Sequence, residues 1–340
     1  MEPVRIGVIG LGWFGEIHCQ AIAGIPGLEL AALCTRSTRT QFRLEELAQK
    51  SGVSKTFANY NELLKDPDID AVSITTMWDQ HTAPALAALA AGKHVFLEKP
   101  MAHTVEDCRR ICEAASKAPG NLMVGRICRF NPRYIAAKRE IESGSLGKIL
   151  SLTARRNIPA AWTPEILDKF GSFIGDTIHD ADVMLWLTGD RVVSAYAQTV
   201  DLRGRKYPDV GQTMYRFASG ASAILEAVWC MPEKTPFDID ERMSIIGSDG
   251  FIHIQDTFPN FGICNADGFR SPDTTYWPET NGQLGGALRE EFLYFVRCIN
   301  EGRRPDIITP EQSMEAVRTT LAAEESAATG QVGGWIDGGS

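Results

Sequence analysis

The 340-residue sequence has no run of about 18 apolar residues, so it predicts no membrane-spanning helix. It has no concentrated basic segment, and its net charge of −9 opposes binding to the phosphates of nucleic acids. Low-complexity tracts and internal repeats are also missing, and an apolar share of 44% is typical of a folded globular protein. These absences favour a small molecule as the main partner and exclude general nucleic-acid and membrane binding.

The eight cysteines form no C-x-x-C pair. Cys108 and Cys112 lie one helical turn apart, but no second pair follows that would complete a metal site. Scattered thiols are typical of a reducing compartment, and the N-terminal MEPVRIGVIG enters a strand pattern at once, which leaves no room for a signal peptide. We therefore expect a cytoplasmic protein with reduced cysteines and no metal.

Strand and helix patterns alternate over the first third of the chain. The predicted strands are VRIGVI at 4–9, LELAALC at 28–34, AVSITT at 71–76 and HVFLEKP at 94–100. This alternation is typical of a parallel sheet with crossover helices. It predicts a dinucleotide-binding Rossmann domain over residues 1–124.

Residues 125–340 show a different pattern. Segments such as GQTMYRFAS, ASAILEAVW and MSIIGSDGFIHIQ alternate apolar and polar residues, which predicts a large, mostly antiparallel sheet with one open face. Helices are expected near 132–143, 176–187 and 309–329, and the last of them is expected to pack back on the first domain. The fold class is α/β, with an α+β second domain for substrate binding and oligomerisation. The open face predicts a homodimer or homotetramer.

A glycine-rich turn, GLGWFG at 10–15, joins the first strand to the following helix. Glycines in that context permit a tight turn and the approach of a pyrophosphate to the helix N-terminus, which predicts a dinucleotide site. The second strand ends without the Asp or Glu that usually binds the ribose of NAD, and carries Thr35, Arg36, Ser37 and Arg39 instead. Such donors suit a 2′-phosphate, so NADP is favoured and NAD stays possible. The alternative is that both arginines are solvated surface charges.

Several later motifs carry a resemblance to a known family. AGKHVFLEKP (91–100) is the most specific, and it is supported by VGRICRFNPRY (124–134), IHDADVMLWLTG (178–189) and LREEFLYFVRCINEGRRP (288–305). Over nearly its whole length the sequence resembles the Gfo/Idh/MocA family of NAD(P)-dependent sugar and cyclitol dehydrogenases. With the resemblance, the predicted cofactor contacts are Gly10, Gly12, Trp13, Phe14, Gly15, Thr35, Arg36, Ser37, Arg39, Thr76, His81, Glu98 and Lys99.

The resemblance also implies that Lys99 of the E-K-P motif and His179 on the first helix of the second domain act on the substrate. A lysine can hydrogen-bond the substrate oxygen, and a histidine can exchange the hydroxyl proton near neutral pH. Family members usually carry an acid four residues before this histidine, where this chain has Gly175. We expect Asp176 to serve as that acid from an unwound first turn, which glycine permits. The alternative is that Asp176 is an N-cap.

These residues together predict an oxidoreductase that transfers a hydride between a nicotinamide and a secondary alcohol or ketone of a sugar, sugar derivative or cyclitol. Two alternatives stay open: a redox-neutral glycoside-processing enzyme with tightly bound NAD, and a non-catalytic NADP-binding sensor. If the substrate is acidic or phosphorylated, the candidates to contact it are Arg126, Arg129, Arg155 and Arg156. The alternative is that these arginines are solvated surface charges.

Overall fold

The computed structural model describes residues 2–36, 41–162, 166–255 and 260–334. The chain divides into two compact units, Met1–Phe130 with Tyr276–Met314, and Asn131–Thr275 with Glu315–Ser340. The predicted boundary at 124 placed every later residue in the second domain, whereas this division returns 276–314 to the first. The reason lies in helix α8 (Gly286–Asn300), whose Phe292 stacks on Phe96 of the first unit with ring centroids 4.4 Å apart.

The first unit is built on a six-stranded sheet in the order β3-β2-β1-β4-β5-β6. All of its paired strands are parallel, which confirms the predicted Rossmann arrangement. The strands are β1 (Val4–Ile9), β2 (Leu28–Cys34), β3 (Lys55–Phe57), β4 (Ala71–Ile74), β5 (His94–Leu97) and β6 (Leu122–Val124).

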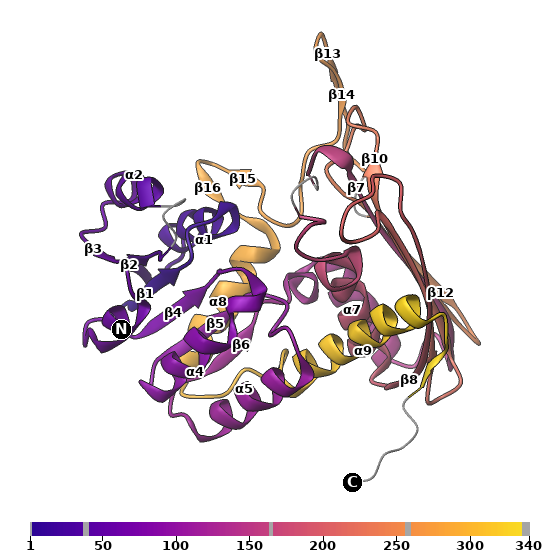
Figure 1. Ribbon diagram of the computed structural model, residues 1–340, viewed down its shortest axis with the longest axis horizontal. Coiled ribbons are helices and arrows are strands. Elements are labelled where there is room, and N and C mark those ends of the chain that lie inside the picture. The colour runs from indigo at the N-terminus through magenta and orange to yellow at the C-terminus, as the bar shows by residue number, and fades with distance from the viewer. Residues whose placement is uncertain (1, 37–40, 163–165, 256–259, 335–340) are drawn as a thin grey trace. The chain divides into compact units, whose positions relative to one another are not determined.

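Helices flank this sheet on both sides, as the left part of Figure 1 shows. They are α1 (Trp13–Ala23), α2 (Gln41–Ser51), α3 (Tyr60–Lys65), α4 (Thr82–Ala90), α5 (Val105–Lys117) and the later α8. The central strand β4 is buried at every residue, as a sheet covered on both faces requires. Ligands of such sheets bind where the strands end, at the carboxyl edge.

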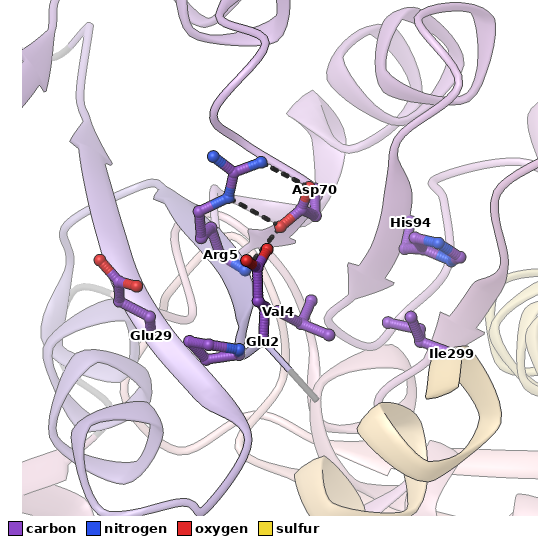
Figure 2. Close-up of a pocket in the computed structure, with 8 residues that line it drawn as sticks. Glu2, Val4, Arg5, Glu29, Asp70, His94 and Ile299 are labelled. Atoms are coloured by element: carbon purple, nitrogen blue, oxygen red, sulfur yellow. Dashed lines mark hydrogen bonds and ion pairs between the residues drawn. The ribbon is translucent and has the colours of Figure 1, made fainter. Parts of the chain in front are cut away.

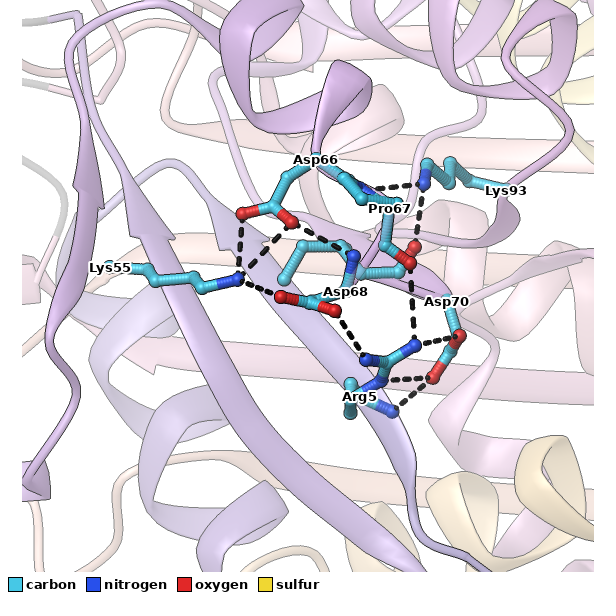
Figure 3. Close-up of polar contacts among 8 residues, drawn as sticks. Arg5, Lys55, Asp66, Pro67, Asp68, Asp70 and Lys93 are labelled. Carbon is cyan, nitrogen blue, oxygen red and sulfur yellow. Dashed lines mark hydrogen bonds and ion pairs between the residues drawn. The ribbon is translucent and has the colours of Figure 1, made fainter.

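The opposite, amino edge of the sheet is joined by charged side chains (Figure 3). Arg5 at the start of β1 donates from Nε and Nη2 to the two oxygens of Asp70, each over 3.0 Å. Lys55 lies 2.9 Å from an oxygen of Asp66 and 2.8 Å from one of Asp68. Exposed pairs of this kind each contribute little to stability, and together they connect β1 and β3 to the loop before β4.

A pocket lies beside this network at the same edge, and Figure 2 shows the side chains that line it. Glu2, Glu29 and His94 come from the amino ends of strands or the residues before them, and Ile299 comes from α8. Arg5 also lines the pocket, and its guanidinium group is hydrogen-bonded to Asp70. This pocket is therefore at the end of the sheet remote from the glycine-rich turn.

The second unit contains a seven-stranded sheet in the order β12-β11-β7-β10-β9-β8-β17. Strands β7 and β10 are parallel and the other neighbours are antiparallel, so the sheet is mostly antiparallel, as predicted. The strands are β7 (Ile149–Pro159), β8 (Val192–Val200), β9 (Val210–Phe217), β10 (Ser222–Met231), β11 (Asp240–Gly247), β12 (Phe251–Gln255) and β17 (Gly333–Gly334). Two short hairpins, β13–β14 (Ile263–Asn265, Gly268–Arg270) in this unit and β15–β16 (Glu279–Thr280, Gln283–Leu284) in the first, complete the strands.

One face of the seven-stranded sheet carries α7 (Ile178–Thr188) and the second-unit part of α9 (Pro310–Thr329), as Figure 1 shows. Helix α6 (Pro132–Glu142) packs against α7. The other face exposes Tyr196 (39%), Met214 (54%) and Ile224 (46%), which lie opposite one another on β8, β9 and β10. This apolar row, Tyr196–Met214–Ile224, is the open face expected from the sequence. Within the described part of the chain, no helix is long and apolar enough to cross a membrane.

Candidate active site

The three glycines of the turn between β1 and α1 have different surroundings. Gly10 has a φ of +102°, and a Cβ there would lie 2.7 Å from the backbone nitrogen of Thr76. A Cβ on Gly15 would collide with the carbonyl oxygen of Gly10, whereas one on Gly12 would meet no atom within 4 Å. The first and third glycines therefore let the backbone turn and pack, and the second leaves open space in front of the helix. That is the space a dinucleotide pyrophosphate occupies in this fold.

The N-terminus of α1 and the end of β4 border that space. Gly12 is the N-cap and offers no side chain, so the first amides of α1 remain available to an anion. Trp13 is 57% exposed, Phe14 is half-buried, and the Thr75 hydroxyl donates to the carbonyl of Gly10 over 2.6 Å. The buried Thr76 Oγ1 has no hydrogen-bond partner among the described residues. An open cradle beside such a hydroxyl fits a bound dinucleotide.

The end of β2 carries the residues expected to choose between NAD and NADP. Thr35 is buried and donates its amide to the carbonyl of Phe57, and the following Arg36 is exposed. Ser37 and Arg39 lie outside the described residues. No acidic residue follows β2 before residue 45, so a guanidinium is the charged group closest in sequence to the strand end.

Lys99 follows β5 and is half-buried, with its backbone amide donating to Glu98 Oε2 over 3.0 Å. The other carboxylate oxygen lies 3.2 Å from His18 Nε2, and His18 Nδ1 lies 2.8 Å from the hydroxyl of Ser73. Burial opposes the charge of Glu98, but the hydrogen bond and charge of His18, together with Lys99, hold the pKa of that carboxyl below its ordinary value. A Cβ on Gly125 would lie 2.6 Å from Glu98 Oε1, so only a glycine at this position leaves enough space for the carboxylate.

His81 joins the loop after β4 to the loop after β5. Its ring is 1% exposed, with Nδ1 2.8 Å from the carbonyl oxygen of Pro100 and Nε2 3.0 Å from that of Thr76. Burial lowers the pKa of His81, against the two carbonyls that favour a proton on its ring. His81 and Glu98 thus have protein partners on both of their polar atoms, so their side chains hold the loops around Lys99.

In the second unit, His179 is half-buried in the first turn of α7. The residues before it, Phe173–Thr177, form a π-helix that includes Gly175 and Asp176. Asp176 Oδ2 accepts a hydrogen bond from Trp229 Nε1 over 2.9 Å, and no side-chain capping bond forms at the start of either helix. The N-cap alternative is therefore wrong, and the expected unwound turn is instead a wider helical turn.

A buried ion network anchors α7 directly after His179. Arg156 on β7 contacts Asp180 over 3.1 Å and Glu241 over 3.0 Å, and the Tyr134 hydroxyl donates to Glu241 over 2.7 Å. Burial raises the pKa of Asp180 to about 6, although the charge and hydrogen bonds of Arg156 act in the opposite direction. This network fixes the helix that presents His179.

The arginines considered for an acidic substrate all bond within their own unit. Backbone carbonyls or side-chain oxygens of the protein accept from each of Arg126, Arg129, Arg155 and Arg156. Among the residues that the structure describes, no group of three or more His, Cys, Asp or Glu is placed to hold a metal ion. Each of the four arginines therefore has a structural partner within the protein.

Comparisons with known proteins agree with this arrangement. Residues 4–126 match the model of an oxidoreductase family with an NAD-binding Rossmann fold, and residues 134–253 match the GFO/IDH/MocA C-terminal domain. A myo-inositol 2-dehydrogenase of Thermotoga maritima is 29% identical over 95% of this chain and 96% of its own length. A scyllo-inositol 2-dehydrogenase (NAD(+)) of Bacillus subtilis is 30% identical over 96% of this chain and 94% of its own.

The fold also matches solved structures. One is scyllo-inositol dehydrogenase from Lactobacillus casei with bound cofactor NAD(H) and scyllo-inositol, with a TM-score of 0.83 and 25% identity. The match covers 97% of this chain and 98% of that one. The likeness therefore extends through both units and includes the Rossmann sheet and the large second sheet.

Proposed function

Because the chain belongs to the Gfo/Idh/MocA oxidoreductase family, we propose that it is an inositol dehydrogenase, which moves a hydride between a ring carbon of the cyclitol and a nicotinamide. The observation that carries the proposal is the placement of Lys99 at the carboxyl edge of the sheet, its backbone held by the buried carboxylate of Glu98. End-to-end similarity to relatives named for myo- and scyllo-inositol supports the substrate class.

The bound nicotinamide would supply the hydride acceptor or donor, and three side chains of this protein would handle the hydroxyls. Lys99 hydrogen-bonds the reacting oxygen and lowers the pKa of its proton. His179 exchanges that proton, a role suited to an imidazole near neutral pH. Asp176 accepts a hydrogen bond from a neighbouring hydroxyl and so orients the ring.

The proposed cofactor is NADP, with NAD accepted more weakly. Arg36 is exposed directly after Thr35, where a ribose 2′-phosphate would meet a guanidinium and not a carboxylate. The residues proposed to hold the remainder of the dinucleotide are Gly10, Gly12, Trp13, Phe14, Gly15, Thr35 and Thr76. Ser37 and Arg39, outside the described residues, belong to the same proposal. Glu98 and His81 would act on the cofactor site indirectly, by holding its loops.

Two further proposals concern the whole protein. The Tyr196–Met214–Ile224 row would be covered by a second copy of the chain in a homodimer or homotetramer, because exposed apolar faces of this kind normally find a partner. All eight cysteines are free thiols, which supports a reducing, cytoplasmic location.

The direct test is an assay of purified protein with myo-inositol, scyllo-inositol, sugars and sugar acids, each with NADP and NAD, following nicotinamide absorbance. Lys99→Ala and His179→Ala should each lower kcat by about 10² to 10⁴ while leaving the cofactor Kd nearly unchanged. Lys117→Ala, at an exposed lysine on α5, is the matched control and should behave as the wild type. The proposal fails if no cyclitol is turned over, or if Lys99→Ala keeps more than half of the activity.

A further inference from the structure

Trp229 on β10 is held rigidly inside the second unit. It is 2% exposed and packs in a core cluster with Ile158 and Leu167. Its backbone amide donates to the carbonyl of Asp209 over 2.8 Å, and its own carbonyl accepts from Arg203 Nη2 over 2.7 Å. Because the ring is packed in the core and the backbone is hydrogen-bonded on both sides, the indole has one orientation. Its N–H group therefore points in a fixed direction.

The indole occupies the space beside residue 175. A Cβ on Gly175 would lie 2.5 Å from Trp229 Cη2 and 2.8 Å from Phe170 Cε2, closer than real Cβ atoms approach other atoms. Both obstacles are buried or half-buried rings, and their centroids lie 6.1 Å apart in an edge-on contact. An acid at position 175 is therefore excluded by Trp229 as long as the indole stays where it is.

The π-helix that contains Gly175 also contains Asp176, the acid one residue later. Single π turns are rare and recur at functional sites, and each takes one more residue than an α-helical turn. Here Phe173–Thr177 takes up that residue, and the Thr177 hydroxyl donates to the carbonyl of Phe173 over 2.9 Å inside the turn. The half-buried Asp176 then presents Oδ2 to Trp229 Nε1 at 2.9 Å.

We propose that Trp229 is a positioning residue for Asp176, and that its indole N–H holds one carboxylate oxygen so that the other is aimed at a hydroxyl of the substrate ring. Gly175 is part of the same arrangement, because a residue without a side chain leaves space for the indole of Trp229. The inference rests on the proposed function, in which Asp176 binds the cyclitol. It assigns to Trp229 an indirect part in choosing among substrates that differ at the hydroxyl next to the reacting carbon.

The first test is Trp229→Phe, which keeps an aromatic ring in the core and removes the N–H donor. We expect KM for the inositol substrate to rise about 10-fold with kcat changed less than about 3-fold, because a hydrogen bond that orients a charged group is lost. Trp186→Phe, on α7 of the same unit, is the matched control and should leave both constants near the wild type.

A deoxyinositol that lacks the neighbouring hydroxyl separates positioning from general damage to the core. For that analogue the wild type and Trp229→Phe should have similar KM values, since Asp176 has no hydroxyl to bind. In the Asp176→Asn background, Trp229→Phe should add less than about 2-fold to KM, because two residues that act as one unit are not additive. A KM rise of equal size for inositol and deoxyinositol would overturn the inference and leave Trp229 as a packing residue.

Gly175→Ala tests the same device from the helix side if Trp229→Phe does not fold. The added methyl group should displace the indole of Trp229 and raise KM for inositol, as Trp229→Phe does. In this variant the tryptophan itself, with its N–H donor, is retained. If Asp176→Asn leaves KM unchanged, the proposed role of Asp176 is wrong. If Asp176→Asn raises KM and both Trp229→Phe and Gly175→Ala do not, only the positioning role of Trp229 is wrong.

Discussion

Replacing His18 with phenylalanine should destabilise the protein by about 1–3 kcal/mol at pH 7, the range expected when a buried polar group loses its hydrogen-bond partner. His18 is fully buried, and its Nε2 lies 3.2 Å from the carboxylate of Glu98. Its ring lies among Phe14, Phe96 and Phe292, with centroids 4.8, 5.6 and 5.1 Å away. A phenyl ring suits such neighbours, so the expected cost comes from the carboxylate and not from a cavity.

The destabilisation should depend on pH with a definite sign. In the wild type the pKa of Glu98 is lowered on folding, so its ionised form contributes stability above the ordinary glutamate pKa, and this contribution is lost as the pH falls through the folded pKa. Without His18, burial becomes the dominant effect and favours the protonated acid. The difference between wild type and His18→Phe should therefore be largest near neutral pH. It should shrink as the pH falls, first through the raised pKa of Glu98 in the variant and then through its lowered pKa in the wild type, which lie on either side of the ordinary glutamate value of about 4.3.

Urea unfolding at pH 7 and near pH 4 measures this difference directly, from the shift of the midpoint at constant slope. His18→Phe with Glu98→Gln is the control, since it removes the charge together with its partner and should recover part of the loss. Wild-type stability in His18→Phe at pH 7 would refute the pairing. A loss of equal size at both pH values would show that the cost is one of packing.

The remaining predictions concern the cofactor and the assembly. Arg36→Ala should weaken NADP binding by about 10-fold, a loss of about 1.4 kcal/mol, and leave NAD binding nearly unchanged, as fluorescence titration of both nucleotides would reveal. Equal losses for the two cofactors, or a wild-type preference for NAD, would reject the role of Arg36. Ile224→Glu, in the centre of the Tyr196–Met214–Ile224 row, should convert a dimer or tetramer into smaller species in light scattering, because it buries a charge at the interface. A wild-type protein that is already monomeric at micromolar concentration would contradict the proposed assembly.

Local sequence patterns predicted the strands that are either apolar throughout or alternate regularly between apolar and polar residues. Strands β1 and β2 begin and end at the predicted residues, because each is a clear apolar run bounded by turn residues. Strand β3 was missed because it has three residues, too few for a periodic signal. The fingerprint glycines were also predictable, since their roles depend on the turn itself.

Strand β7 was missed for a different reason. It buries Arg156 and Asn157 in a run that also contains exposed positions, so the apolar pattern breaks near its end. The charge of Arg156 is tolerated there because Asp180 and Glu241 meet it from α7 and β11. Such compensation comes from residues far away in the sequence, and a reading of local periodicity assigns those positions to the surface.

The position of Asp176 depends on a packing partner in the same way. A regular helix assigns each residue a direction from its distance to His179, and on that rule an acid three residues away does not replace one four residues away. The rule does not apply directly here, because an indole from β10 fills the place of a side chain at 175 and the turn is a π-helix and not a regular α-helical turn. The same tryptophan leaves no room for a side chain at 175 and donates a hydrogen bond to the acid at 176. It lies more than fifty residues later in the chain, so only the folded structure brings the three together.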